Sequence, residues 1–184
     1  LASFLPFSFF VAYGVMSIPA GMLLERFGAK PGMIGAYALA FAGSFLFASV
    51  PGFTVALASL FTIGIGMTLL QVAINPLLRV AGGEEHFAFF SVMAQLVFGS
   101  ASFLSPYVYS YLVTHLQGYA GGGNLLVDTL ARHVPGPLPW VSLYWVFAAV
   151  TAVMLVVLGI VRLPKVKLTA EERPGAWETH KRLF

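Results

Sequence analysis

The stretch FTVALASLFTIGIGMTLLQVAINPLL, residues 53 to 78, decides the fold of this chain. It has no charged residue, and it is longer than the run of about 20 apolar residues that crosses the hydrocarbon core of a bilayer. The same stretch places Gln71, Asn75 and Pro76 within six residues. In hydrocarbon each unpaired polar group costs several kcal/mol. The stretch therefore predicts a membrane-spanning helix whose polar groups have partners or a task.

The composition of the whole chain indicates an all-α integral membrane protein. The chain is 59% hydrophobic and 9% charged, whereas soluble domains carry about 25% charged residues. Cysteine is absent, which excludes disulfides and thiol catalysis. The net charge of +3 comes without a nucleic-acid motif, so we expect no nucleic-acid partner. No nucleophile–base motif, phosphate loop or metal-ligand spacing is present, which predicts a protein that is not an enzyme and has no cofactor or metal.

The sequence predicts five membrane spans, a partial transmembrane bundle over residues 1–162, and a polar tail over 163–184. The predicted spans are residues 1–24, 31–50, 53–78, 87–116 and 138–161. Between the last two spans lies a Gly- and Pro-rich loop, residues 118–137, in which LLVDTLAR predicts a short surface helix. The small residues of the spans predict close helix packing: Gly35, Ala36, Ala40, Gly43, Gly64, Gly66 and Gly99.

The basic residues predict the orientation of these spans in the bilayer. If the five spans alternate, nine of the ten Lys and Arg residues fall on one side, which the positive-inside rule makes cytoplasmic. The nine are Arg26, Lys30, Arg79, Arg162, Lys165, Lys167, Arg173, Lys181 and Arg182. This orientation starts the first span outside, so we expect one further span before it, six in all, and a tail that is cytoplasmic or begins a central linker.

A polar motif follows the first span. The loop GMLLERFGAK, residues 21 to 30, reads G-x-L-x-E-R-x-G-x-K. It resembles the cytoplasmic loop signature of the major facilitator superfamily, with Glu25 in place of the more common Asp. The resemblance implies a cytoplasmic gate that ties the two halves of a carrier together, formed by Gly21, Glu25, Arg26, Gly28 and Lys30. The alternative is a plain basic loop with a turn glycine.

A polar face runs along the span at residues 53–78. Gln71, Asn75 and Arg79 are spaced i, i+4, i+8 and so share one face. Pro76 has no N–H, which leaves the Val72 carbonyl without its usual partner and predicts a local helix distortion. Carboxamides both donate and accept hydrogen bonds, which suits the hydroxyls of a neutral polyhydroxylated solute. The alternative is hydrogen bonding between helices, worth about 1 kcal/mol per contact.

The run GMTLLQVAINP, residues 66 to 76, resembles the fourth helix of the fucose/glucose/galactose symporter family within the major facilitator superfamily. The resemblance implies helices two to six of a six-helix half-bundle, with the first helix and the C-terminal half of the protein outside this chain. It implies cation-coupled transport of a neutral sugar, a hexose such as glucose, galactose or fucose, by alternating access across a bacterial inner membrane. Proton-coupled members have Glu where this chain has Gln71, which cannot titrate. Three alternatives stay open: sodium coupling, proton coupling through a carboxylate in the first helix outside this chain, and facilitated transport without a coupling ion.

The resemblance extends to the span at residues 87–116. Gln95 matches an Ala-Gln pair of the family and becomes a third candidate sugar contact beside Gln71 and Asn75. Phe98 stands where an Asn often follows. For Ser91, on the same face as Gln95, we expect a hydroxyl bonded back to its own helix. Two other functions stay open: a facilitator-superfamily drug exporter, and a structural subunit of a membrane complex.

Overall fold

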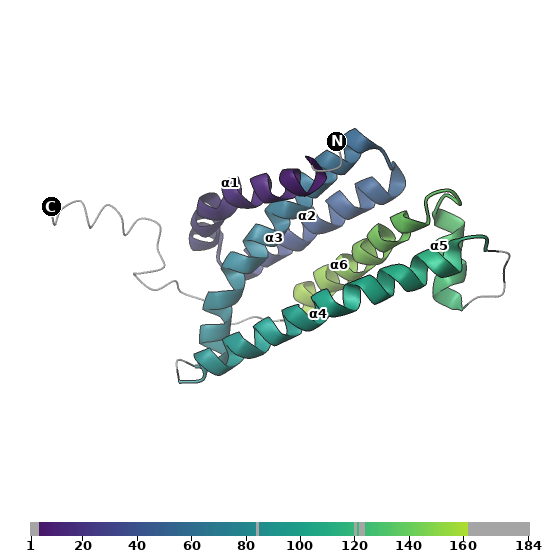
Figure 1. Ribbon diagram of the computed structural model, residues 1–184. Coiled ribbons are helices and arrows are strands. Elements are labelled where there is room, and N and C mark those ends of the chain that lie inside the picture. The colour runs from purple at the N-terminus through teal and green to yellow at the C-terminus, as the bar shows by residue number, and fades with distance from the viewer. Residues whose placement is uncertain (1–3, 84, 120, 122–123, 162–184) are drawn as a thin grey trace.

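The computed structural model describes residues 4–83, 85–119, 121 and 124–161, and these residues form helices and turns without a strand (Figure 1). The elements are α1 (Phe4–Phe27), α2 (Ala29–Ser49), α3 (Phe53–Gly82), α4 (Phe87–Leu116), α5 (Leu125–His133), the short 3-10 helix η1 (Pro139–Val141) and α6 (Ser142–Ile160). Five segments are long and apolar enough to cross a membrane: α1, α2, α3, α4 and η1–α6 together. The all-α fold with five spans is thus confirmed, and the predicted tail at 163–184 lies outside the described residues.

Three helix ends lie a few residues beyond the predicted span boundaries. Helix α1 continues through Glu25 and Arg26 to Phe27, and the chain turns at Gly28, whose φ of 86° favours glycine. Helix α3 runs past Leu78 to Gly82, because Pro76 removes one hydrogen bond without ending the helix. Charged residues end an apolar run, but water at the membrane surface solvates them, so the helix itself continues.

The third boundary is the start of α2. The helix begins at Ala29, two residues before the predicted start at Pro31. A proline is tolerated in the first turn of a helix, where its missing N–H has no intrahelical partner to lose. Pro31 therefore lies inside α2 rather than before it.

Close packing of glycines joins α3 to both of its neighbours. Helix α3 packs against α1 and α2, and α2 also packs against α6. A Cβ added at Gly64 would lie 2.7 Å from the Phe9 carbonyl oxygen of α1, and one at Gly66 would lie 2.6 Å from the Ala36 carbonyl oxygen of α2. Main chain thus meets main chain, as small residues permit in membranes. Gly35 and Gly99 make no such contact within the described residues, since apart from the helix's own backbone nothing there lies within 4 Å of an added Cβ.

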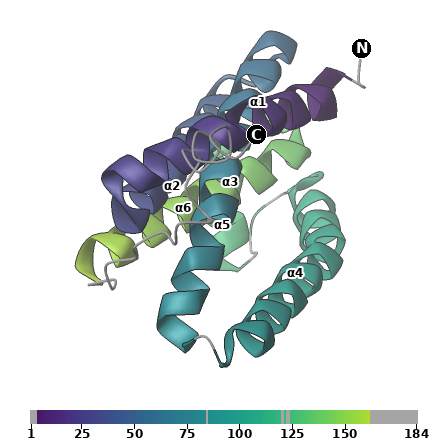
Figure 2. The ribbon, with the colours of Figure 1, turned by 90° about the vertical axis from the view of Figure 1, so that its left-hand side faces the viewer.

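Helix α4 has a different environment from the other spans. It meets α3 at one end and diverges from it toward the other (Figure 2). Its buried side chains within the described part are Leu112 and Leu116, near its C-terminus. There they join an apolar cluster with Val127 and Leu130 of α5 and with Val141. The predicted surface helix is therefore confirmed as α5, and it packs on the end of α4.

The two ends of the bundle are fixed by contacts between distant segments. At one end, which we call the inner end, Lys30 Nζ donates a hydrogen bond of 2.7 Å to the carbonyl of Val161. At the other end, which we call the outer end, the centre of the Phe47 ring lies 4.5 Å from the centre of the Tyr144 ring and 5.7 Å from that of the Trp140 ring. The start of α2 therefore lies beside the end of α6, and the two helices run antiparallel, as the assumed alternation of the spans requires.

Candidate functional site

The three predicted solute contacts line one cavity. A hollow of about 340 Å³ lies between α2, α3 and α4. Its polar lining includes Gln71 and Asn75 from α3 and Gln95 from α4. The other lining residues are Met33, Tyr37, Met67, Leu70, Ile74, Leu78, Ser91, Ala94 and Phe98. The volume lies at the low end of the range of about 300–1,000 Å³ that small-molecule sites occupy.

A second cavity lies on the other side of α3. It measures about 410 Å³ and is lined by Tyr13, Gly21, Leu24, Gln71, Val72, Asn75 and Pro76. Gln71 and Asn75 line both cavities. Their i, i+4 spacing stacks them on adjacent turns of α3. The two carboxamides therefore separate one hollow from the other, with α4 on one side and α1 on the other.

The third member of the predicted polar face behaves differently. Arg79 lines neither cavity, and its guanidinium carbon lies 5.1 Å from the centre of the Phe87 ring. That position joins the last turns of α3 to the start of α4 by a cation–π contact. The polar face thus divides into two cavity-lining carboxamides and one cation at the inner end.

Gln71 has a partner that the sequence did not reveal. The Tyr13 hydroxyl of α1 donates a hydrogen bond of 3.2 Å to Gln71 Oε1, across 58 positions of sequence. Tyr37 of α2 also lines the first cavity. Each is a tyrosine inside an apolar span, so each carries a hydroxyl at membrane depth. The argument that singled out Gln71 applies to these two residues, and it would have found them.

The prediction for Ser91 was wrong. Ser100, Ser102 and Thr114 of the same helix bond back to the carbonyls four residues earlier. The Ser91 hydroxyl is buried and has no hydrogen-bond partner among the residues that the structure describes. It belongs to the lining of the first cavity together with Gln95.

The motif predicted as a cytoplasmic gate lies at the inner end. Gly28 makes the turn between α1 and α2, and Gly21 lines the second cavity. The Arg26 guanidinium carbon lies 5.4 Å from the centre of the Phe27 ring. Lys30 reaches the last turn of α6, where its Nζ lies 2.7 Å from the Val161 oxygen and 3.5 Å from the Gly159 oxygen. A cation at the C-terminus of a helix is favourable, because the carbonyls there carry partial negative charge.

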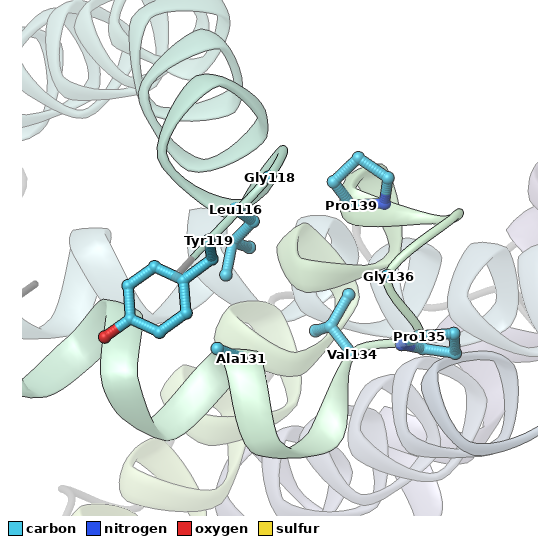
Figure 3. A pocket seen from close by; sticks show the side chains of 8 residues that line it. All are labelled: Leu116, Gly118, Tyr119, Ala131, Val134, Pro135, Gly136 and Pro139. Carbon is cyan, nitrogen blue, oxygen red and sulfur yellow. The ribbon is translucent and has the colours of Figure 1, made fainter. Parts of the chain in front are cut away.

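A further hollow of about 230 Å³ opens at the outer end, beside α5 (Figure 3). Its lining side chains are apolar apart from Tyr119, whose hydroxyl Figure 3 shows pointing away from Pro135 and Pro139. The other polar atoms of this hollow belong to the main chain. The carboxamides that the sequence singled out lie instead in the two cavities beside α3.

Comparison with known proteins agrees with this architecture. The family model described as "Major Facilitator Superfamily" matches residues 1–183. Among curated proteins, the "Glucose/galactose transporter" of Brucella abortus is 27% identical over 180 residues, which are 94% of this chain and 41% of the relative. The "L-fucose-proton symporter" of Haemophilus influenzae is 27% identical over 183 residues, 91% of this chain and 42% of the relative. The chain thus spans less than half the length of these relatives.

A solved structure shows the same fold. It is described as a Major Facilitator Superfamily transporter, FucP, in the outward conformation, and it matches with a TM-score of 0.65 at 24% identity over 90% of this chain and 42% of that one. The named relatives are transporters, in agreement with the prediction that the chain is not an enzyme. The names also agree with the symporter branch that residues 66–76 resemble. The chain belongs to the major facilitator superfamily.

Proposed function

We propose that this chain forms the sugar-binding part of one half of a secondary transporter for a neutral hexose. The observation that carries the proposal is the convergence of three carboxamides, Gln71, Asn75 and Gln95, from two helices on one cavity of about 340 Å³. The names of the relatives support a sugar as the solute. The activity of the whole protein also requires the part of the relatives' length that this chain does not span.

The chemistry of the cavity favours an uncharged, hydroxyl-rich solute. None of its lining side chains carries a formal charge. An anion would need Arg or Lys and a cation would need carboxylates, whereas carboxamides both donate to and accept from hydroxyls. Tyr37 and Phe98 add aromatic surface to the lining, which suits the apolar C–H face of a sugar ring.

The transport cycle that we propose is alternating access. Two bundles enclose the solute near the middle of the bilayer and rock about it. Gly21, Glu25, Arg26, Gly28 and Lys30 form the gate at the inner end, which faces the cytoplasm of a bacterial inner membrane. We further propose that the cycle is coupled to a cation. Gln71 has no titratable proton, so a coupling proton would use another group, and sodium is the second candidate.

The proposal is tested by uptake of radiolabelled D-glucose, D-galactose and L-fucose into cells that express the natural full-length protein. Gln71→Ala, Asn75→Ala and Gln95→Ala should each lower uptake at unchanged surface expression. Gln117→Ala is the matched control, because Gln117 is an exposed carboxamide at the end of α4, outside both cavities. Wild-type uptake in all three variants would remove these residues from the site.

Three further outcomes would decide the function and the coupling ion. Efflux of an apolar dye without uptake of any hexose would replace the sugar transporter with a drug exporter. Uptake that depends on external sodium and survives a protonophore identifies sodium as the coupling ion. Uptake that is abolished by the protonophore and indifferent to sodium identifies the proton.

A further inference from the structure

The hydrogen bond between Tyr13 and Gln71 engages the oxygen end of the Gln71 carboxamide. The Tyr13 hydroxyl donates to Gln71 Oε1 at 3.2 Å. Within the described residues no other hydrogen bond of Gln71 is found, so its Nε2 keeps two N–H groups for another acceptor. A carboxamide can present either its oxygen or its nitrogen to a solute. In this arrangement the oxygen faces Tyr13 and the N–H donors are the groups left to bind a solute.

The position of Tyr13 relative to α3 is set by main-chain packing. Its neighbour Ala12 is fully buried, and the Ala12 Cβ would lie 3.0 Å from a Cβ added at Gly64 of α3. One turn earlier, Ser8 Oγ donates a hydrogen bond of 2.8 Å to the Leu57 carbonyl of α3. These contacts fix the register of α1 along α3. The phenol of Tyr13 therefore meets Gln71 at a fixed height on the helix.

Tyr13 and Gln71 both lie on the wall of the second cavity. The bond joins a group outside the first cavity to one of the three carboxamides inside it.

We propose that Tyr13 is a positioning residue that sets the polarity of Gln71, so that the site selects a hydrogen-bond acceptor on the solute at this contact. The proposal rests on the proposed function, in which Gln71 contacts the hexose. It adds a specificity determinant: an oxygen or fluorine at the contacted carbon of the sugar should be tolerated, and a hydrogen should not. Without the Tyr13 hydroxyl the carboxamide is free to rotate, and the site should lose this discrimination.

The test uses Tyr13→Phe, which removes the hydroxyl and keeps the ring, in the natural full-length protein. Uptake of radiolabelled D-galactose and D-glucose is competed with the monodeoxy and monodeoxyfluoro derivatives of each sugar. In the wild type, one ring position should show clearly tighter competition by the fluoro than by the deoxy sugar. In Tyr13→Phe this ratio should fall toward one, and the KM should rise about fivefold with little change in maximal rate, as expected for one neutral hydrogen bond.

A double-mutant cycle with Gln71→Ala shows whether Tyr13 acts through Gln71. Tyr13→Phe should have no further effect in the Gln71→Ala background. The matched control is Tyr107→Phe, since Tyr107 is 65% exposed on α4 and lies outside both cavities. It should match the wild type in KM and in the fluoro-to-deoxy ratio.

The failures of the two proposals are distinguishable. If Gln71→Ala keeps wild-type uptake, or no hexose is transported, the proposed function fails and the inference fails with it. If Gln71→Ala lowers uptake while Tyr13→Phe keeps the wild-type KM and ratio, only the role of Tyr13 is overturned. An equal loss from Tyr13→Phe with and without Gln71 would also overturn it, because Tyr13 would then contact the solute itself.

Discussion

Replacement of Gly66 by alanine should destabilise the bundle and disturb the site. A Cβ at this position would lie 2.6 Å from the Ala36 carbonyl oxygen and 3.2 Å from the Ala40 nitrogen of α2, whereas ordinary contact begins at 3.4 Å. Both neighbours are backbone atoms, so no side chain can rotate away. Helices α2 and α3 must therefore separate by about 0.8 Å, the gap between 2.6 and 3.4 Å.

The net free-energy change follows from two opposing effects. Overpacking of a core costs about 1–3 kcal/mol. Alanine in place of glycine within a helix stabilises the folded state by about 0.5–1 kcal/mol, because the unfolded chain has less conformational entropy to lose. For Gly66→Ala the steric cost dominates, and we expect a net loss of about 1–2 kcal/mol. Gln71 lies five residues further along α3, so a displaced helix should also raise the KM for the transported sugar.

Gly99→Ala is the matched control. Gly99 is also inside a helix, but apart from that helix's own backbone no atom of the described part of the chain lies within 4 Å of an added Cβ. Only the helix preference of alanine acts there, so this variant should be at least as stable as the wild type. The assay is thermal unfolding of the full-length protein in detergent, followed by uptake in cells. If Gly66→Ala unfolds at the temperature of Gly99→Ala or above it, the steric reasoning is refuted.

Three other substitutions test separate features. Lys30→Met removes the cation from the end of α6, so amide hydrogen exchange in the last turn before Val161 should accelerate a few-fold, in line with a helix-end charge effect of about 0.3–1 kcal/mol. Lys30→Arg should restore the protection. Unchanged exchange in Lys30→Met would contradict the contact. Gln71→Glu introduces a titratable group at a cavity wall. Its uptake relative to the wild type should increase as the external pH falls, because the protonated carboxyl resembles the carboxamide. A ratio of variant to wild-type uptake that does not change with pH would argue against contact between residue 71 and the solute. Asn124→Ala removes the N-cap of α5 at a cost of about 1 kcal/mol of helix stability, so amide hydrogen exchange within α5 should become faster. Exchange equal to that of the wild type would show that the cap does not stabilise α5.

Much of the fold could be predicted because the thickness of the bilayer sets the length of each apolar span, and the membrane sides differ in how many Lys and Arg residues they hold. Five apolar runs predicted the five spans. The distribution of Lys and Arg predicted their orientation, under the assumption that successive spans alternate. The ends of the helices were harder to predict. An apolar run ends at the membrane surface, but the helix can continue into water, as α1 does through Glu25 and Arg26. The divergence of α4 has no sequence signature, since an exposed span and a packed span are equally apolar.

The candidate site was predictable where its residues lie on one helix. The spacing of Gln71 and Asn75 gave their shared face, and a resemblance gave Gln95. Tyr13 was missed because the argument about polar groups inside a span was applied to carboxamides and not to tyrosine hydroxyls; only its partner, 58 positions away, needed the structure. The Ser91 prediction failed for a related reason. Back-bonding is the usual local choice for a serine in a helix, and only the assembled cavity shows that Ser91 departs from it.

The two sides of the first cavity differ in how freely they can vary. Helix α3 is located by main-chain contacts through Gly64 and Gly66, so its carboxamides keep their places whatever side chains surround them. Helix α4 contributes Ser91, Gln95 and Phe98 to the same cavity while burying little of itself in the described bundle. Diversification of sugar preference, in evolution or in a designed library, should therefore concentrate on α4 and leave the glycines of α3 unchanged.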